Sequence, residues 1–302
     1  MNKFLFFIKL RCGLGDYVCS TSLISELKKM FPNKKIILIT GNKIVFENNL
    51  DIFKIIYIKE RIFQVIYSYV FLFLSKIFKN NIYICFYKKD KYKTHEEEIR
   101  VGSQDNYLKL ISRHWNLPIN YKNIKNKIVF SNEEIEMYGK KYNFLPKNYI
   151  LIHSQGKISY TPNKEIGYDF FQKIINMFEN LNWIQIGDEK DKKLNKCIDL
   201  TGKTNIRELF YLVSKSQFIV CQEGAYNHIA NAFSIPAVTI FTGFSPKKIY
   251  SYKNTIAIQS ENLPECSPCM LIKKECPYNM KCINGNKEEI ILQIYNQISR
   301  FY

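Results

Sequence analysis

Blocks of apolar and polar residues follow one another along this chain in the order strand, helix, strand. A continuous apolar run at Phe4–Ile8 is typical of a strand buried on both faces of a parallel sheet. An amphipathic pattern at Ser20–Met30 predicts a helix, which Pro32 ends. Further strand-like runs lie at residues 35–40, 52–58 and 82–86. This order predicts an open α/β sheet in the N-terminal half.

The same order restarts after a polar, helical stretch at residues 131–147, which we interpret as the linker. Strands are predicted at 149–153, 183–186, 218–221 and 237–241, and helices at 168–181, 206–214, 228–233 and 287–301. Two similar α/β halves with a cleft between them place ligands at the carboxyl ends of the strands.

The composition supports two folded domains. The chain has 302 residues, of which 46% are apolar and 24% charged, so there is enough apolar material for two cores and disorder is not expected. The net charge of +17 predicts a general attraction to anionic surfaces. The lysines are scattered, however, and no zinc-finger, RRM or helix-turn-helix pattern is present, so we do not expect a nucleic-acid partner.

One apolar stretch, Ile62–Phe78, raises the question of a membrane. It contains Gln64, Ser68, Ser75 and Lys76 and falls short of the roughly 20 apolar residues of a membrane span. We interpret it as a core or interfacial helix. The apolar start of the chain leads straight into a glycine turn, so no secretory signal is expected. We therefore expect a cytoplasmic protein with reduced thiols, and peripheral contact with the inner membrane stays open.

The first segment that suggests chemistry is Gly13-Leu14-Gly15-Asp16, between the first predicted strand and helix. Gly13 and Gly15 allow a sharp turn and the close approach of a substrate. A dinucleotide fingerprint would need a third glycine where the chain has Val18, which disfavours a Rossmann cofactor site. Asp16 at the mouth of this turn can accept a proton from an acceptor hydroxyl. Capping of the following helix is the alternative role.

Two segments of the C-terminal half suggest a phosphate site. Lys164 lies before a predicted helix, where it can hold a diphosphate, although an ordinary surface lysine is the alternative. Glu223, Gly224, Asn227 and His228 lie between a predicted strand and helix. Backbone N–H groups at that helix start can bind phosphate oxygens, and Glu223 can bind ribose or sugar hydroxyls. His228 is either a phosphate ligand or an ordinary core histidine.

Four of the nine cysteines cluster near the C-terminus with the spacing C-x2-C-x6-C-x5-C, at Cys266, Cys269, Cys276 and Cys282. Four thiolates so close in sequence can enclose a tetrahedral ion, so we expect a knuckle with structural Zn²⁺ or iron. The spacing is not that of ferredoxins. Reduced or disulfide-bonded cysteines without a metal are the alternative.

Taken together and in this order, the motifs resemble glycosyltransferase family 9, the ADP-heptose:lipopolysaccharide heptosyltransferases. The Gly-Asp turn at residues 15–16, Leu200-Thr201-Gly202-Lys203-Thr204 and the strand region 235–243 carry the resemblance. It covers nearly the whole chain and is weakest over residues 44–147.

The chain departs from the family pattern in three places. Ser20-Thr21-Ser22 stands where members usually show Thr-Thr-Pro. Lys164-Glu165-Ile166-Gly167 shares only its lysine with the family's Lys-Arg-Trp-Pro. Glu223 to His228 has Glu for Asp in the family's Asp-Ser-Gly-Pro-Met-His, and Ala225 in place of its glycine. The departures at Ile166 and Glu223 bear on the identity of the donor more than on the type of reaction.

The resemblance implies a GT-B fold, in which two Rossmann-like domains face each other across a cleft. We therefore expect an acceptor-binding domain at residues 1–140 and a nucleotide-sugar-binding domain with the four-cysteine loop at 141–286. The last helix, 287–302, is expected to pack back on the N-terminal domain.

The resemblance also implies roles for individual residues. Asp16 matches the position of the family's general base, and Lys164 matches the lysine that contacts the donor diphosphate. Glu223, Gly224 and His228 match the positions that hold the donor phosphate and sugar. We expect an inverting enzyme that moves a heptose or similar sugar from ADP-heptose to a hydroxyl of a lipopolysaccharide or lipooligosaccharide core, or of another surface glycan. No metal is expected to be essential for transfer.

Two other functions remain open. One is a protein O-glycosyltransferase of the autotransporter heptosyltransferase type. The other is a non-enzymatic nucleic-acid-binding protein that uses the four-cysteine knuckle and its basic charge.

Overall fold

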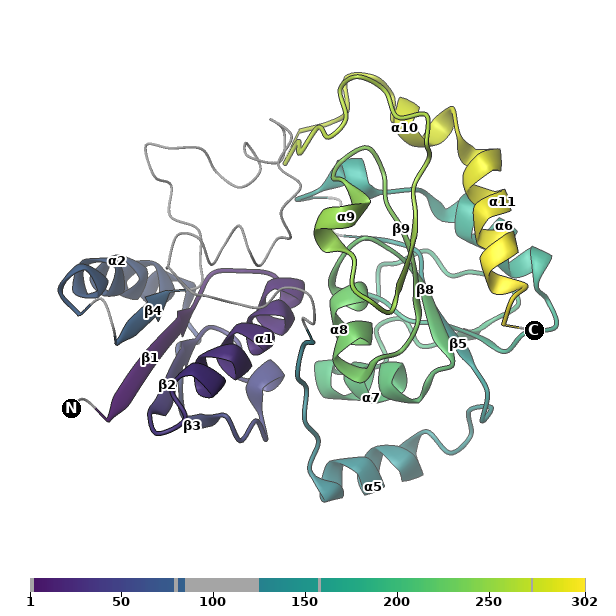
Figure 1. Cartoon of the computed structure of the whole chain (residues 1–302). Helices are drawn as coiled ribbons and strands as arrows, with labels where there is room; N and C mark the ends of the chain where they lie inside the picture. The colour runs from purple at the N-terminus through teal and green to yellow at the C-terminus, as the bar shows by residue number, and fades with distance from the viewer. Residues whose placement is uncertain (1–2, 79–80, 85–124, 157–158, 273, 302) are drawn as a thin grey trace. The chain divides into compact units, whose positions relative to one another are not determined.

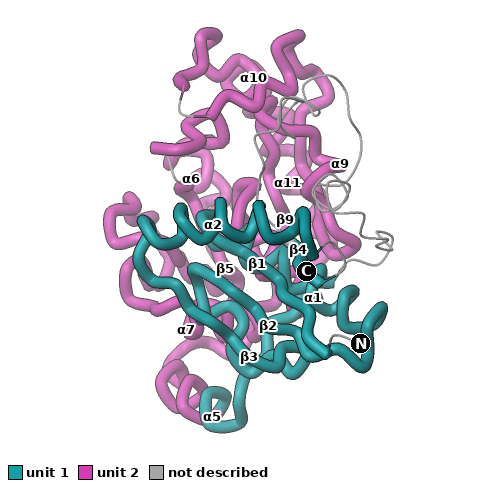
Figure 2. Tube along the Cα trace, turned by 90° about the vertical axis from the view of Figure 1, so that its left-hand side faces the viewer, with its two compact units in different colours: residues 1–95, 105–135 teal, residues 96–104, 136–302 magenta. Residues whose placement is uncertain are grey.

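The computed structural model describes residues 3–78, 81–84, 125–156, 159–272 and 274–301 (Figure 1). The chain forms two compact units, coloured teal and magenta in Figure 2. Unit 1 comprises Met1–His95 and Asp105–Ile135, and unit 2 comprises Glu96–Gln104 and Glu136–Tyr302. Each unit contains its own parallel sheet, which confirms the predicted α/β class.

Unit 1 contains a four-stranded sheet in the order β3-β2-β1-β4. Leu5, Phe7 and Ile8 of the inner strand β1 are completely buried, as a continuous apolar run in a parallel sheet requires. The predicted strand at 82–86 is present as β4, and its last two residues lie outside the described residues. The strands are β1 (Phe4–Lys9), β2 (Lys35–Thr40), β3 (Ile52–Tyr57) and β4 (Ile82–Ile84), with a 3-10 turn η1 (Ile44–Phe46) between β2 and β3.

Helix α1 (Leu14–Met30) begins six residues before the predicted start at Ser20. Its N-cap is Gly13, whose N–H donates to Asp16 Oδ2 at 3.1 Å, so the aspartate side chain closes the first turn. The polar run Ser20-Thr21-Ser22 is buried within the helix, because each hydroxyl donates to a backbone carbonyl three residues earlier at 2.6–2.7 Å. The prediction missed residues 14–19 because Gly13-Leu14-Gly15-Asp16 was interpreted as a turn before the helix.

Helix α2 (Arg61–Ile77) connects β3 to β4 and matches the helix predicted at 62–78. Gln64 on this helix is buried and bonded at both ends of its amide. Its Oε1 accepts a hydrogen bond from Arg11 N–H at 3.1 Å, and its Nε2 donates to the Ile58 carbonyl at 2.9 Å. One buried side chain therefore ties α2 to the loop after β1 and to the end of β3.

Unit 2 contains a six-stranded parallel sheet in the order β10-β9-β8-β5-β6-β7. Its core includes the fully buried Phe171, Phe218 and Val220. The strands are β5 (Ile150–His153), β6 (Trp183–Gln185), β7 (Ile198–Asp199), β8 (Phe218–Gln222), β9 (Ala237–Ile240) and β10 (Thr255–Ile258). The connections contain η3 (Pro162–Lys164), α6 (Tyr168–Met177), α7 (Ile206–Lys215), α8 (Ala225–Phe233), α9 (Lys247–Tyr250) and α10 (Lys281–Asn284).

Helices α5 (Asn132–Lys141) and α11 (Lys287–Ile298) are the first and last described helices associated with unit 2, and the sequence predicted a position for each. Helix α5 lies where the helical linker was predicted and spans the boundary between the two units. The last helix, α11, was expected on the N-terminal domain. Its buried face, which includes Ile290 and Ile294, instead belongs to the core of unit 2 and contacts α6 and β10.

Candidate functional site

In the sheet of unit 2, the order in which successive strands are added reverses between β5 and β8. After β5 the chain adds β6 and β7 on one side, and it then adds β8, β9 and β10 on the other. His153 and Cys221 lie opposite each other near the carboxyl ends of β5 and β8. Ligands of open α/β sheets bind outside the carboxyl ends of the strands at such a switch point. The candidate site is therefore built from the segments that follow these two strands.

Lys164 and Glu223 form an ion pair at this place, with side chains that are only 19% and 6% exposed. Lys164 ends η3, and Glu223 directly follows β8. The Lys164 ammonium also lies 4.7 Å from the ring centroid of Phe244 and 5.6 Å from that of Tyr250. Aromatic faces attract a cation. The arrangement holds one positive charge in a fixed position, where it can meet a phosphate oxygen.

Asn163 fixes the backbone beside Lys164. Its buried side chain donates to the carbonyls of Leu271 at 3.0 Å and Lys274 at 2.8 Å, and its own carbonyl accepts from the Thr242 hydroxyl at 2.8 Å. Leu271 and Lys274 belong to the loop that carries the four cysteines. Three segments that are far apart in the sequence therefore meet beside the lysine.

Helix α8 begins at Ala225, with Gly224 as its N-cap. The first N–H groups of a helix have no partner within it and can bind phosphate oxygens. The Asn227 side chain is completely buried. Its amide is nevertheless satisfied, because Nδ2 donates to the Tyr250 carbonyl and Oδ1 accepts from the Thr255 hydroxyl, both at 2.7 Å. The predicted ligand contact of Asn227 is thus limited to its backbone.

His228 lies in the beginning of α8 and is largely buried. Its Nδ1 is 2.7 Å from the Tyr252 hydroxyl, and the two rings meet edge to face. Tyr252 therefore fixes the orientation of the imidazole. The structure brings Lys164, Glu223, Gly224 and His228 to one region of unit 2, in which residues 250–252 contact both Lys164 and His228.

Sequence reasoning missed several polar and aromatic residues at this site, among them Glu165. Its Oε2 accepts hydrogen bonds from Gly156 N–H at 2.9 Å and from Gln222 Nε2 at 3.1 Å. A Cβ atom at Gly156 would lie 2.5 Å from Gln222 Nε2, so a larger residue there would displace this amide from its bond to Glu165. The glycine after β5 was a visible signal, whereas no sequence pattern indicated the partners that surround it.

His153 at the end of β5 packs against Tyr226, with ring centroids 4.0 Å apart. Burial lowers the pKa of His153 to about 3, and its Nδ1 is enclosed. The imidazole is therefore neutral at physiological pH, and it adds no charge to the site around Lys164.

In unit 1 the predicted base, Asp16, lies in the first turn of α1, after the carboxyl end of β1. Gly13 is the N-cap and Gly15 lies inside the helix, so the turn is shorter than predicted. The hydrogen bond from Gly13 shows that Asp16 caps the helix. The same bond orients its carboxylate, and proton acceptance and capping are compatible roles.

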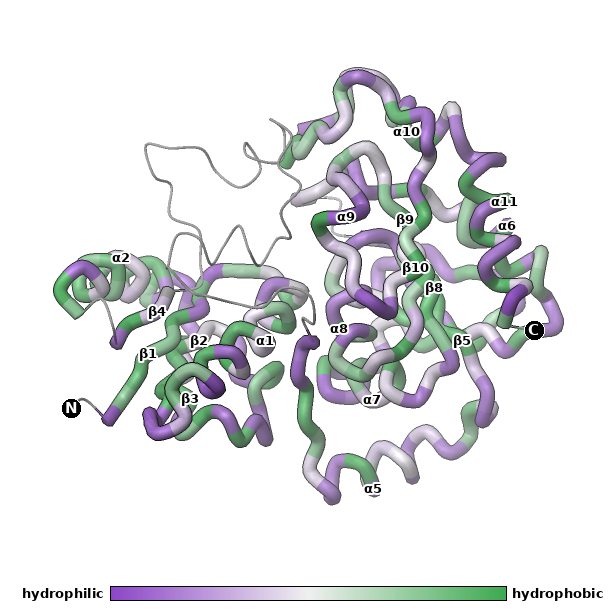
Figure 3. Tube along the Cα trace, in the orientation of Figure 1, coloured by the Kyte–Doolittle hydropathy of each residue, from purple (hydrophilic) through white to green (hydrophobic). Residues whose placement is uncertain are grey.

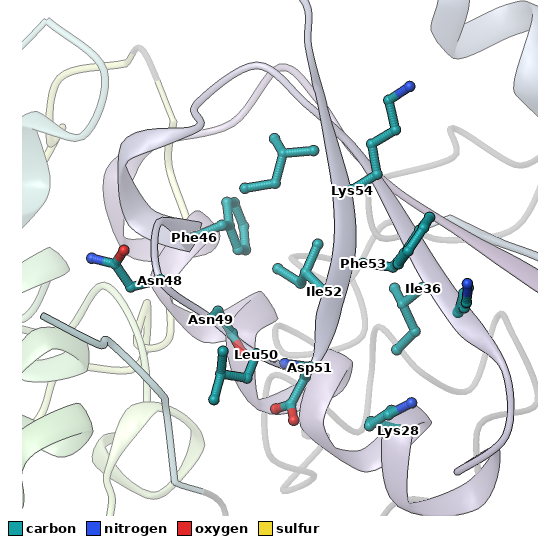
Figure 4. A pocket seen from close by; sticks show the side chains of 12 residues that line it. Lys28, Ile36, Phe46, Asn48, Asn49, Leu50, Asp51, Ile52, Phe53 and Lys54 are labelled. Carbon is teal, nitrogen blue, oxygen red and sulfur yellow. Dashed lines mark hydrogen bonds between the residues drawn. The ribbon is translucent and has the colours of Figure 1, made fainter. Parts of the chain in front are cut away.

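An open pocket of about 520 Å³ lies at the opposite edge of this sheet (Figure 4). It is lined by the starts of β2 and β3, the residues before β3, and Lys28 near the end of α1. Asp51 in this pocket accepts hydrogen bonds from Lys127 at 2.8 Å and Ser25 at 2.9 Å. The pocket lies at the amino ends of the parallel strands, whereas Asp16 follows the carboxyl end of β1. The pocket is therefore remote from Asp16 and is not the predicted site.

The predicted metal ligands Cys266, Cys269, Cys276 and Cys282 line one small pocket of unit 2. Burial, with a smaller contribution from the other cysteines, raises the pKa of the Cys269 and Cys282 thiols. Among the residues that the structure describes, no three His, Cys, Asp or Glu side chains are arranged to hold a metal ion. The four thiols therefore line one cavity, but they are not arranged around a common point as the ligands of a metal ion would be.

Comparison with solved structures shows the same fold in heptosyltransferases. A family 9 glycosyltransferase from Veillonella parvula DSM 2008 has a TM-score of 0.64 at 13% identity, over 97% of this chain and 99% of the other. ADP-heptose LPS heptosyltransferase II from E. coli gives 0.57 at 12%, over 96% and 99%. Iron-containing dodecameric glycosyltransferase TibC from enterotoxigenic E. coli H10407 gives 0.66 at 12%, over 99% and 77%.

Sequence comparison gives the family directly. No curated protein matched the chain. The profile of glycosyltransferase family 9 (heptosyltransferase) matches residues 105–281, which is more than half of the chain. The chain therefore belongs to glycosyltransferase family 9, and it is a glycosyltransferase.

Proposed function

We propose that this enzyme transfers a heptose or similar sugar, with inversion, from ADP-heptose to a hydroxyl of a lipopolysaccharide or lipooligosaccharide core, or of another surface glycan. The observation that carries the proposal is the enclosed Lys164 beside the start of α8, at the switch point of the unit 2 sheet. Structures with this fold include an E. coli heptosyltransferase with ADP-2-deoxy-2-fluoro heptose and TibC with ADP-D-beta-D-heptose. A protein hydroxyl is the alternative acceptor.

In this proposal the donor diphosphate binds the Lys164 ammonium and the N–H groups at the start of α8. Asp16 accepts the proton of the acceptor hydroxyl while its oxygen bonds to the anomeric carbon. The bond from that carbon to the diphosphate breaks, and the nucleoside diphosphate leaves with the electron pair. Lys164 stabilises the negative charge that develops on the leaving group.

We also propose that the four cysteines hold a structural Zn²⁺ or iron ion. Their thiols already line one cavity, and thiolates are good ligands for both metals. The ion would fix the loop of residues 266–282 and would take no part in sugar transfer. Metal analysis of the purified protein tests this proposal.

The proposed transfer is tested with Asp16→Asn, because asparagine can still accept the hydrogen bond from Gly13 but cannot take a proton. We expect ADP and ADP-heptose to raise the melting temperature of both proteins, since a ligand at 100 times its dissociation constant adds about 2.7 kcal/mol of stability. Transfer should fall by about 10²–10⁴-fold in the variant. The control ligands are GDP and UDP.

Two results would contradict the proposal. Turnover that survives in Asp16→Asn would remove the base assignment. A melting temperature unchanged by ADP-heptose, or raised more by another nucleotide, would remove the donor assignment. RNA binding without any nucleotide-sugar affinity would favour the nucleic-acid alternative.

A further inference from the structure

Helix α2 carries an unusual concentration of exposed apolar side chains, and most of its length is coloured as hydrophobic in Figure 3. Each of them exposes between 42% and 67% of its surface. Monomeric soluble proteins rarely leave so many large apolar side chains together in water, and such patches mark binding surfaces. We call this surface the α2 face; it consists of Ile62, Phe63, Ile66, Tyr67, Tyr69, Val70, Phe73, Ile77 and Phe78.

Two uncharged polar side chains of the same helix point inward. Gln64 and Ser68, four residues apart, are buried, and Gln64 is bonded to the chain on both sides of its amide. Phe71, Leu72 and Leu74 pack against the core of unit 1. The helix is therefore held firmly by one side while its more apolar side is displayed, the reverse of an ordinary amphipathic helix.

Both charged side chains of α2 are positive. Residues 61–77 contain no Asp or Glu, and the carboxylate nearest to them in sequence is that of the N-cap, Glu60, which follows Lys59. Arg61 and Lys76 stand at the two ends of α2, and both are exposed. Two copies that met through this face would bring these cations together without carboxylates from the helix to pair them. The charge pattern complements an anionic surface instead.

We propose that the α2 face docks onto an anionic phospholipid bilayer, with the helix lying in the plane of the interface. A helix of 17 residues is about 26 Å long, and its exposed aromatic rings suit the headgroup region. Basic residues beside an apolar helix face are typical of interfacial helices that bind anionic lipids. In the described part of the chain no helix is long and apolar enough to cross a bilayer.

This docking deepens the proposed function, because it would bring the enzyme to a membrane glycolipid acceptor, and it can be tested apart from transfer. The probe is sedimentation with vesicles of phosphatidylethanolamine and phosphatidylglycerol, compared with pure phosphatidylcholine vesicles. We expect the protein to bind the anionic vesicles and not the zwitterionic ones.

The decisive variant is Phe63→Asn/Phe73→Asn, which keeps the net charge. We expect its partition to anionic vesicles to fall about tenfold or more, because two large apolar side chains no longer enter the lipid. The matched control is Leu50→Asn, which removes another exposed apolar side chain of unit 1 and should bind like the original protein. Melting shifts with ADP should be equal in all three proteins.

Three results would overturn the docking proposal. Vesicle binding that is unchanged in the double variant would mean that the charge of +17 alone attracts the protein. No vesicle binding by any protein would exclude the lipid. Self-association that the double variant abolishes, without vesicle binding, would assign the α2 face to a second copy. A failed transfer assay with intact vesicle binding would contradict only the proposed function.

Discussion

The Lys164 side chain has little freedom, because a carboxylate and two aromatic rings surround its ammonium. A buried ion pair adds little net stability, since both charges lose their hydration. The free energy lost in desolvating the two charges has a purpose if the Lys164 ammonium binds a ligand. A lysine that already points at the phosphate position loses little conformational entropy when the ligand binds.

We predict that Lys164→Met weakens ADP binding about 10- to 100-fold, because a charged phosphate contact is lost. It should also lower the free energy of unfolding by about 3 kcal/mol, since Glu223 stays buried without its partner. Lys164→Met/Glu223→Gln should recover much of that stability and none of the affinity. Calorimetry and urea unfolding measure the two quantities.

The control for this experiment is Lys173→Met, which breaks the exposed ion pair to Glu288 and should change neither quantity. Full recovery of ADP binding in the double variant would show that Glu223, not the lysine, determines the affinity. The phosphate role of Lys164 would then be wrong.

At this scale the sequence predicted single residues better than their partners. Lys164 and His228 could be proposed from the sequence because each lies in a motif next to a predicted helix. Phe244 and Tyr252 were not found, because they reach the site from loops after β9 and α9, and only folding brings them there. Asn227 was assigned to the ligand, whereas its amide holds residues 250 and 255 in place.

Among the elements, the four-cysteine loop has a second connection to the site besides its position after β10. The side chain of Asn163 donates to two carbonyls of this loop, and Cys269 N–H donates to the Gly243 carbonyl next to Phe244. Both Asn163 and Phe244 are neighbours of Lys164. A well-ordered loop therefore helps to fix the position of Lys164, although the loop itself need not contact a ligand.

We predict that the purified protein contains about one Zn²⁺ or iron per chain and that Cys276→Ser lowers this content together with the melting temperature. Weaker ADP binding should accompany the loss of metal, because the loop contacts the neighbours of Lys164. Cys197→Ser, outside the cluster, should keep the metal. Metal-free protein whose melting temperature a chelator does not change would contradict the prediction.

Helix α6 was predictable because burial of one face imposes a period on its sequence, and β1 because burial on both faces gives a continuous apolar run. Shorter elements were not: β7 has two residues, and α9 and α10 have four each, which is too short for any period. The first turns of two helices were also missed, because each follows a glycine in a segment that was interpreted as a turn or loop. α1 and α8 both begin earlier than predicted, with a glycine as N-cap.

At the level of the whole molecule, each unit contains carboxylates that folding stabilises in the charged form. Burial raises the pKa of Asp51, Asp199 and Glu208, but hydrogen bonds and nearby lysines outweigh it and lower each pKa. A group with a lowered pKa stabilises the fold above its unfolded pKa, and this contribution disappears as the pH falls through its folded pKa. Both units should therefore weaken in acid.

Between pH 7 and about 5, protonation of His153 in the unfolded chain alone lowers the free energy of unfolding, while the pKa of Asp191, raised by burial to about 6, increases it. We predict that this free energy, measured with urea, changes little in that range and falls steadily below about pH 4. Asp199→Asn should be less stable at pH 7 and should lose less stability on acidification. Glu136→Gln, at an exposed ion pair of α5, should follow the original curve. An equal slope for Asp199→Asn would exclude this carboxylate as a cause of the acid sensitivity.

The bonds of Asn163 have a consequence for exchanging parts between related enzymes. Residues 162–165 look like a short cassette that could be moved into another scaffold to alter sugar choice. The side-chain and carbonyl bonds of Asn163, however, end on Thr242, Leu271 and Lys274. A chimera that receives the cassette alone would inherit its lysine without the supports that aim it, so all three segments have to be transplanted together.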